Sequence, residues 1–238
     1  MTDSESDPTA AAEWPLSLRG VTETVVTTRG PNDRWNVAAL GVHAPDEAGR
    51  DGDDGDGRDD GDGGGGDDPN GGVATATTWG DTRTRKNFDR RGRGVIQFVS
   101  DPRTFVEAAV TIREEADPVL PSAHAWAEVE VERIDSGESN GTRRERWALY
   151  PVESAVRERV VPRLNRGAAA VIEATVAASR LDVPAYDADE LLSRLRYFAE
   201  TVDRCGGAPE REAFAILDDA TEWRERLPDE VDAPRFDA

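Results

Sequence analysis

The pattern of apolar and polar positions divides the chain into a strand-rich first part and a helical second part. Short runs that are rich in β-branched residues, or that alternate between apolar and polar residues, are typical of β-strands. Six such runs occur before residue 151: Val21–Thr28, Trp35–Val42, Val73–Trp79, Gly94–Ser100, Ala125–Ile134 and Arg143–Tyr150. Residues Gly30–Asp33 supply a turn between the first two runs. We therefore predict six strands in the first part.

Helical signals appear once among these strands and then dominate the second part. After the fourth strand, Asp101 as N-cap and Pro102 at the first helical position predict a helix that extends to Arg113. Beyond Pro151 the apolar residues recur at helical spacing. Three helices are predicted there: Ala168–Leu181, Ala188–Val202 behind the N-cap Asp187, and Glu210–Arg226. The fold class is α+β, a six-stranded antiparallel β-barrel followed by a C-terminal helical appendage, because closing a small sheet removes its exposed edges.

Very polar segments mark the expected domain boundaries. Residues 46–72 contain eleven glycines and eleven acidic residues, so they cannot bury enough apolar surface to offset the entropy of ordering. We interpret them as a disordered acidic insertion between two strands. The expected organisation is a disordered N-terminus at 1–13, a barrel at 14–150 that contains the insertion, a helical appendage at 151–227 and a disordered tail at 228–238.

Composition and charge narrow the classes of partner. The 238 residues carry a formal charge of −20, which argues against nucleic acid or an anionic membrane as a partner. Of the 29 basic residues only Lys86 is a lysine, a composition typical of proteins from a halophilic archaeon. The single cysteine excludes an internal disulfide, and no Cys/His cluster predicts a metal site. Without a basic leader or an apolar stretch of membrane length, we expect a cytoplasmic protein.

A cationic segment stands out in this acidic chain. Residues 81–93, DTRTRKNFDRRGR, contain six cations against two acids. Hydroxyl, guanidinium and amide groups in this segment are suited to hold an anion such as a phosphomonoester. They belong to Thr82, Arg83, Thr84, Arg85 and Asn87. The alternative, which composition alone favours, is a charged turn whose arginines pair with neighbouring acids.

Four stretches of the sequence together resemble a known family. They are TETVVTTRGPN (22–32), WNVAALGV (35–42), DTRTRKNF (81–88) and NRGAAAVIEATVAASRL (165–181). The chain resembles the archaeal domain-of-unknown-function family 447 over most of residues 20–220, and the T-x-T-x-x-N element at Thr82–Asn87 is the most specific motif. Members of that family are similar to the FMN-binding split barrels, a class that includes flavin reductases and pyridoxamine-phosphate oxidases. These proteins are usually homodimers with the flavin near the subunit interface.

The resemblance implies a split form of the barrel, FMN as cofactor, a homodimer and a set of binding residues. The FMN phosphate is expected at Thr82, Thr84 and Asn87, with Arg83 or Lys86. Main-chain groups of Asn36, Val37 and Ala38 are expected to contact the isoalloxazine ring. Asn165 and Arg166, at the start of the first C-terminal helix, are weaker candidates.

Three functions follow from these observations. The first is an FMN-dependent oxidoreductase, with a nicotinamide or another electron donor as its partner and a substrate that the family does not define. The second is a flavin-binding or sensing module without turnover. The third is a polyanion or nucleotide binder that uses the Arg83–Arg93 cluster, which the overall charge disfavours. No catalytic residue is assigned, because neither His43 nor His124 has a partner at catalytic spacing.

Overall fold

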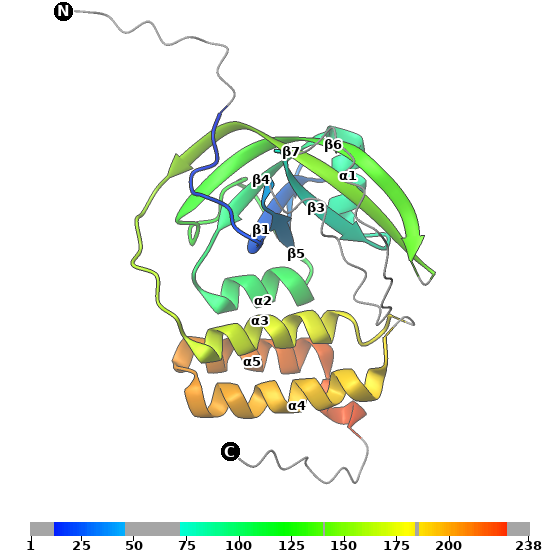
Figure 1. Ribbon diagram of the computed structural model, residues 1–238, viewed down its shortest axis with the longest axis vertical. Coiled ribbons are helices and arrows are strands. Elements are labelled where there is room, and N and C mark those ends of the chain that lie inside the picture. Colours follow the sequence, from blue (N-terminus) through cyan, green and yellow to red (C-terminus); the bar gives the residue numbers. More distant parts are fainter. Residues whose placement is uncertain (1–11, 46–71, 140, 184–185, 228–238) are drawn as a thin grey trace, which may run out of the picture. The chain divides into compact units, whose positions relative to one another are not determined.

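The computed structural model describes residues 12–45, 72–139, 141–183 and 186–227 (Figure 1). The predicted acidic insertion and the two predicted disordered ends lie almost entirely outside these residues. The chain forms two compact units, which we describe separately. One consists of Met1–Val99 with Glu114–Val160, and the other of Ser100–Arg113 with Val161–Ala238.

The first unit is a closed antiparallel β-barrel. Its six strands are β1 (Val21–Arg29), β2 (Trp35–His43), β3 (Ala74–Trp79), β4 (Arg93–Phe98), β6 (Ala125–Ser139) and β7 (Thr142–Val156). They lie in the order β1-β4-β6-β7-β3-β2, and β2 pairs again with β1, so the sheet closes on itself. The predicted six-stranded antiparallel barrel is confirmed.

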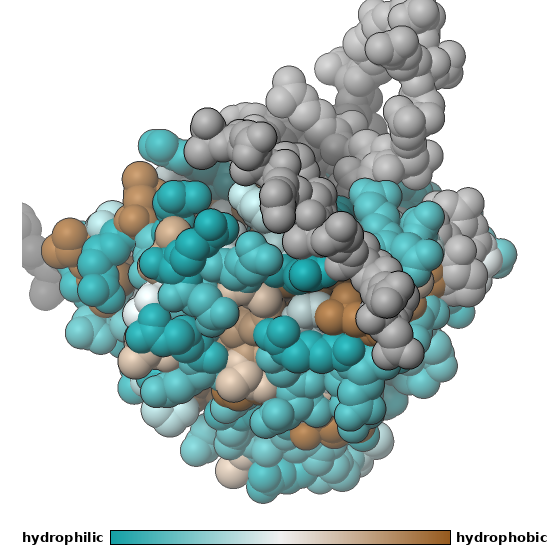
Figure 2. Space-filling model, turned by 90° about the horizontal axis from the view of Figure 1, so that it is seen from below, coloured by the Kyte–Doolittle hydropathy of each residue, from teal (hydrophilic) through white to brown (hydrophobic). Residues whose placement is uncertain are grey.

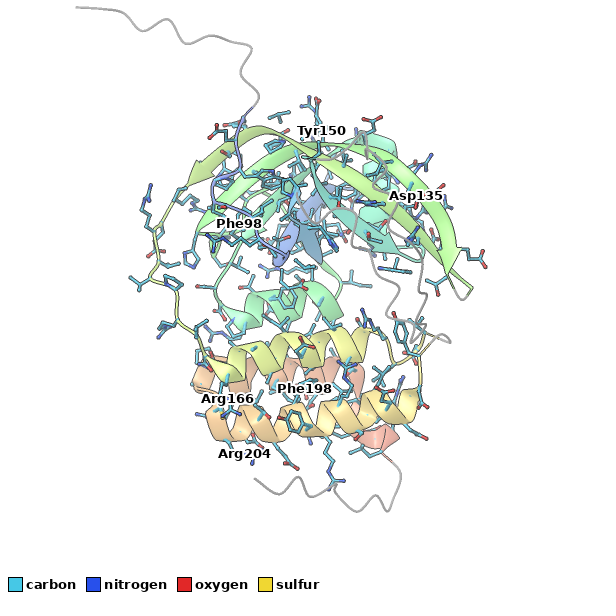
Figure 3. All side chains as sticks on the ribbon, in the orientation of Figure 1. Phe98, Asp135, Tyr150, Arg166, Phe198 and Arg204 are labelled. Carbon is cyan, nitrogen blue, oxygen red and sulfur yellow. The ribbon has the colours of Figure 1, made fainter. Side chains whose placement is uncertain are left out.

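Alternation along the strands places one set of side chains inside the barrel. The inward positions of β7 are Trp147 and Leu149, which are almost completely buried, and Ile96 of β4 is buried on the same core. Phe98 also belongs to this core and contacts Trp14 edge to face, with ring centroids 6.4 Å apart (Figure 3). The two-residue period of the sequence therefore fixes which side chains fill the barrel.

Within the closed sheet, the pairing between β2 and β3 is short. These strands pair only through Val42 and His43 of β2. A short strand that we did not predict, β5 (Arg113–Glu115), pairs with β2 instead. The helix that we predicted to reach Arg113 ends at Val110, because Thr111 already has an extended backbone. The three charged residues of β5 show no alternation of apolar and polar positions, so no strand was predicted.

A second element absent from our prediction is helix α1 (Arg83–Arg91), which lies within the cationic segment. Phe88 is the only large apolar residue in α1, so the sequence contains no apolar periodicity that would predict a helix here. Phe88 is buried in the barrel core and meets Trp147 edge to face at 5.4 Å between ring centroids. A left-handed glycine, Gly92, ends the helix, and its N–H donates to the carbonyl of Phe88.

The second unit is a helical bundle around its own apolar core. It contains α2 (Pro102–Val110), α3 (Arg166–Ser179), α4 (Ala188–Cys205) and α5 (Ala208–Thr221), followed by the 3₁₀ helix η2 (Trp223–Arg226). The predicted N-caps Asp101 and Asp187 are confirmed. Helix α2, which we expected within the barrel domain, packs with α3 and α5, and its Val106 joins their core.

The visible face in Figure 2 is mostly hydrophilic, with small apolar areas between charged side chains. Among the helices of the described residues, none combines the length and hydropathy of a membrane span. The same residues contain no group of three or more His, Cys, Asp or Glu side chains placed to hold a metal ion.

We predict that Phe88→Ala destabilises the barrel by about 3–5 kcal/mol, because it removes a buried aromatic side chain and leaves a cavity beneath α1. Chemical denaturation followed by tryptophan fluorescence measures the loss. Phe88→Leu, which keeps most of the apolar volume, is the matched control and should cost much less. Equal losses for both substitutions would show that the packing of this ring does not hold α1 in place.

Candidate functional site at the start of helix α1

The predicted binding segment begins at a sharp turn after β3. Gly80 has a left-handed backbone with φ of 69°, and its N–H donates to the carbonyl of Arg143 at 2.7 Å. Thr82 is the N-cap of α1, and its Oγ1 accepts a hydrogen bond from the backbone N–H of Arg85 at 3.3 Å. Helix α1 therefore begins at Arg83, shortly after this turn. The residues of the T-x-T-x-x-N motif that follow Thr82 are helical.

The charge at this helix terminus is opposite to the stabilising pattern. The N-terminus of a helix carries partial positive charge and N–H groups without intrahelical acceptors, so acidic residues are favoured there. The first turn of α1 contains no acidic residue, and the cations Arg83, Arg85 and Lys86 lie at its start. The helix dipole and these three side chains have the same sign, so carboxylates or an anionic ligand must compensate them.

Two of these cations form exposed ion pairs. Arg83 Nη1 lies 3.1 Å from Glu114 Oε1 of β5, and Lys86 Nζ lies 2.7 Å from Asp81 Oδ2. The side chains of Arg83 and Lys86 are about half exposed. Exposed ion pairs of this kind contribute about 1 kcal/mol or less, so a phosphate group can replace either carboxylate at small cost.

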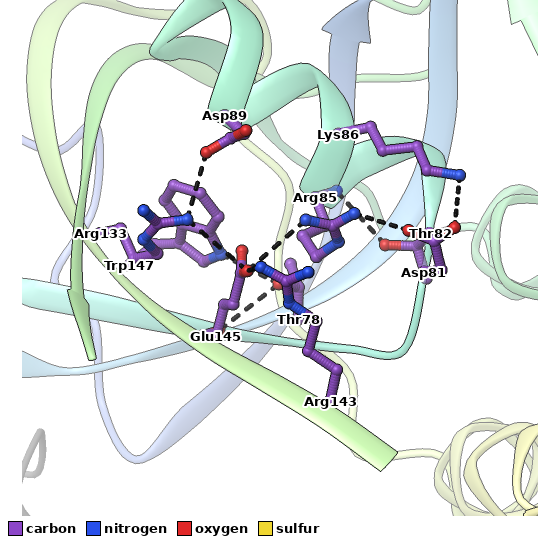
Figure 4. Close-up of polar contacts among 10 residues, drawn as sticks. All are labelled: Thr78, Asp81, Thr82, Arg85, Lys86, Asp89, Arg133, Arg143, Glu145 and Trp147. Atoms are coloured by element: carbon purple, nitrogen blue, oxygen red, sulfur yellow. Dashed lines mark hydrogen bonds and ion pairs between the residues drawn. The ribbon is translucent and has the colours of Figure 1, made fainter. Parts of the chain in front are cut away.

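Arg85 is different because its guanidinium group is buried between two carboxylates (Figure 4). Its Nη2 donates to Asp81 Oδ1 at 2.6 Å, and its Nη1 lies 3.5 Å from Oε1 of the buried Glu145. The hydrogen bond to Asp81 raises the pKa of Arg85, and hydrogen bonds from Lys86 and Arg85 lower the pKa of Asp81. Arg85 is therefore a charged interior contact of α1, whereas Arg83 and Lys86 face solvent.

The other two motif residues, Thr84 and Asn87, lie on the buried face of α1. The Nδ2 of Asn87 donates to Thr28 Oγ1 of β1 at 3.0 Å, and its Oδ1 accepts from Arg90. Asn87 thus ties the helix to the barrel, with its side chain engaged in the protein interior. Thr84 contributes to the open end of the helix through its main-chain N–H, which lies in the first turn.

The structure brings the second predicted segment to the same end of the barrel. Asn36 of β2 pairs with Thr28 of β1, which is the residue that Asn87 contacts from α1. Val37 and Ala38 pair with the next two residues of β1. Thr28 therefore connects the strand that we expected near the isoalloxazine ring with the helix that we expected near the phosphate.

The third predicted segment, Asn165 and Arg166, belongs to the helical unit, where Arg166 begins α3 (Figure 3). The side chain of Asn165 is the N-cap of that helix and accepts a hydrogen bond from the N–H of Gly167 at 2.7 Å. A role for these two residues in flavin binding stays a prediction.

Several residues of this region were not identified as site residues from the sequence. Thr28 is part of the TTRGPN stretch, so the family motif carried a signal for it. Glu145 shares the inward side of β7 with Trp147 and Leu149, and an acid at an inward strand position was the available signal. Glu114 reaches Arg83 from a strand that the pattern did not predict, so its role required the three-dimensional structure.

Two family models match the chain. The model of the N-terminal domain of "Protein of unknown function (DUF447)" matches residues 68–158, and a second model of "Protein of unknown function (DUF447)" matches residues 165–219. Together they cover well over half of the chain. The chain belongs to the DUF447 family.

One solved structure shows the same fold, and others are more distantly similar. An FMN-bound DUF447 protein of Methanosarcina mazei matches with a TM-score of 0.63 and 20% identity over 86% of this chain and 96% of that one. The styrene monooxygenase flavin reductase of Pseudomonas putida matches with a TM-score of 0.36 and 10% identity over 60% and 85%. Nitrilotriacetate monooxygenase component B of Bacillus cereus gives 0.38 and 12% over 63% and 76%. No curated protein matches the chain.

We predict that the Asp81 carboxylate stabilises the DUF447 barrel only while it is charged. Its folded pKa lies below the usual 3.8, so its contribution is fully present above that value and is lost as the pH falls through the folded pKa. The unfolding free energies of wild type and Asp81→Asn should differ at neutral pH and converge below 3.8. Chemical denaturation of both proteins at neutral pH and below pH 3.8 measures this difference in unfolding free energy. A difference that does not change with pH would show that the charge of Asp81 is not responsible.

Proposed function

We propose that this DUF447 protein binds FMN and places the phosphate at the N-terminus of α1. The observation that carries the proposal is the cationic first turn, where Arg83 and Lys86 reinforce the helix dipole in a chain of net charge −20. In this structure Glu114 and Asp81 compensate these two cations, and a phosphate would take the place of the carboxylates at the helix N-terminus. The family relationship adds support, because the Methanosarcina mazei member is described as FMN-bound.

In this proposal each group has a defined part. The N–H groups of the first turn and the hydroxyl of Thr82 donate to phosphate oxygens, and Arg83 and Lys86 supply charge. Thr84 and Asn87 hold the buried face of the helix, and main-chain groups at residues 36–38 contact the isoalloxazine ring. FMN supplies hydride or electron transfer when bound, so we propose an FMN-dependent oxidoreductase.

The polyanion-binding alternative has little support from the described surface. Two cations beyond the first turn of α1 also face carboxylates. Arg91 lies beside Asp33, and Arg93 lies beside Glu130. A long anionic polymer would meet the field of a chain with 49 acidic residues. A compact phosphate at one helix end avoids that repulsion.

Substituting either exposed cation should weaken FMN and spare riboflavin, which has the same ring without the phosphate. Arg83→Ala and Lys86→Ala each remove a charge-assisted contact worth about 1.5–3 kcal/mol, or about tenfold or more in affinity. Titration of both ligands by flavin fluorescence at one fixed high salt concentration gives the two affinities. Arg93→Ala is the matched control, because it removes a similarly exposed cation at the start of β4, just beyond the other end of α1.

The ratio of the FMN and riboflavin affinities decides the assignment. A ratio that falls for Arg83→Ala and Lys86→Ala but stays at the wild-type value for Arg93→Ala supports the site. Equal weakening of both ligands, or unchanged FMN affinity in both variants, would show that the first turn is a charged surface helix end.

We also propose a homodimer with FMN at or near its interface, as the resemblance to the split barrels implies. The amino-acid composition, acidic and almost without lysine, further suggests a protein of a halophilic archaeon, so the measurement belongs at high salt. For a homodimer, sedimentation velocity at high salt should give twice the monomer mass of 25.9 kDa. A monomer that retains one FMN per chain would contradict the proposed interface site.

A further inference from the structure

Glu145 of β7 is a fully buried carboxylate beneath helix α1 (Figure 4). Three guanidinium groups converge on its Oε1 atom. Arg143 Nη2 lies at 2.5 Å, Arg85 Nη1 at 3.5 Å and Arg133 Nη1 at 3.6 Å. These arginines come from β7, α1 and β6 respectively, so one carboxylate joins three elements.

The contacts of Glu145 continue to both ends of α1. On one side Arg85 contacts both Glu145 and Asp81, and Asp81 in turn contacts Lys86. On the other side Arg133 bridges Glu145 and Asp89, with 3.2 Å between its Nη1 and Asp89 Oδ1. A continuous series of ion pairs thus runs from the barrel interior to the ammonium group of Lys86.

Stability alone is a poor explanation for this buried charge. Replacing a buried ion pair by apolar residues of similar volume is often neutral or stabilising. The present pair also leaves Glu145 Oε2 and Arg85 Nε without a hydrogen-bond partner within the described part of the chain. An unsatisfied buried polar atom costs about 1–3 kcal/mol.

The geometry of Arg85 indicates what the charged arrangement achieves. A guanidinium group presents its donors in a fixed planar fork, so its two carboxylate partners must take defined positions. Here the fork holds Asp81, which immediately precedes the N-cap, and Glu145, which is anchored in the barrel. An apolar contact would hold α1 against the barrel but would not determine the position of its first turn.

We propose that Glu145 is a positioning residue for the phosphate-binding turn, acting through Arg85 and Asp81 on Lys86. This inference rests on the proposed function, because it assumes that the first turn of α1 receives the FMN phosphate. Glu145 itself is buried below the helix and reaches the ligand only through Arg85. When Glu145 carries no charge, Arg85 loses its ion-pair partner in the barrel interior. The first turn of α1 is then no longer fixed in the orientation that suits the phosphate.

The test uses two substitutions in the full-length chain and the same pair of ligands, FMN and riboflavin. Glu145→Gln keeps the shape of the side chain and removes its charge. Arg85→Lys keeps a cation beside Glu145 but cannot bridge two carboxylates in a fixed plane, so it decides the matter even if Glu145→Gln does not fold. Glu130→Gln, which removes the surface partner of Arg93, is the matched control. Lys86→Ala reports on the proposed site itself.

We expect Glu145→Gln and Arg85→Lys to lower the FMN-to-riboflavin affinity ratio by more than about threefold, a change typical of residues that act on a site through other residues. Glu130→Gln should leave the ratio unchanged. A change below about threefold in the folded variants, or equal weakening of both ligands, overturns the inference and leaves a purely structural role. If Lys86→Ala alone leaves the ratio unchanged, the positioning role fails, because it acts on Lys86; if Arg83→Ala does so as well, the proposed phosphate site is wrong too.

Discussion

Pairing of β1 with two neighbours is the constraint on which the barrel unit depends. β1 pairs with β2 over nine residues, from Val21 opposite His43 to Arg29 opposite Trp35, and with β4 on its other edge. Without the first pairing the sheet would be open, and its inward side chains would have no enclosed core. Because β1 and β2 are joined by the short turn at residues 30–34, their register is set locally. That register places Thr28 beside Asn36, at the end of the barrel where α1 contacts β1.

Helix α1 combines two kinds of attachment that differ in what they specify. Phe88 and its contact with Trp147 supply apolar burial, which gives affinity between helix and barrel with little directional preference. Asn87 and Arg85 supply polar contacts to Thr28 and Glu145, whose distances and angles restrict rotation and translation of the helix. An anion site requires the second kind, because donors act only when they point at the ligand. Three of the four buried residues of this short helix, Thr84, Arg85 and Asn87, are accordingly polar.

The strands could be predicted from the sequence because each contributes β-branched residues, an alternation of apolar and polar residues, as in β6, or a short continuous apolar run, as in β4. Helix α1 and strand β5 could not, since neither contains a repeated apolar position. The motif and the clustered cations indicated the start of α1 as the candidate site, where the structure exposes Arg83 and Lys86 and buries Asn87. The roles of these residues toward a phosphate stay predictions, and which face each polar residue occupies could not be read from the sequence. The pairing of Arg83 with Glu114 depends on a strand 31 residues away, which local patterns cannot show.

The acidic composition explains why the cations in the first turn of α1, Arg83, Arg85 and Lys86, each lie beside a carboxylate. In a chain with 49 acidic and 29 basic residues, an uncompensated cluster would recruit carboxylates from whatever surface lies nearby. The structure instead assigns Asp81 and Glu114 to the exposed cations and the buried Glu145 to Arg85. High salt weakens the exposed pairs most, because screening acts on charges in contact with solvent. The interior pair between Arg85 and Glu145 is screened less than the exposed pairs of Arg83 and Lys86, so it continues to hold α1 against the barrel when the exposed pairs weaken.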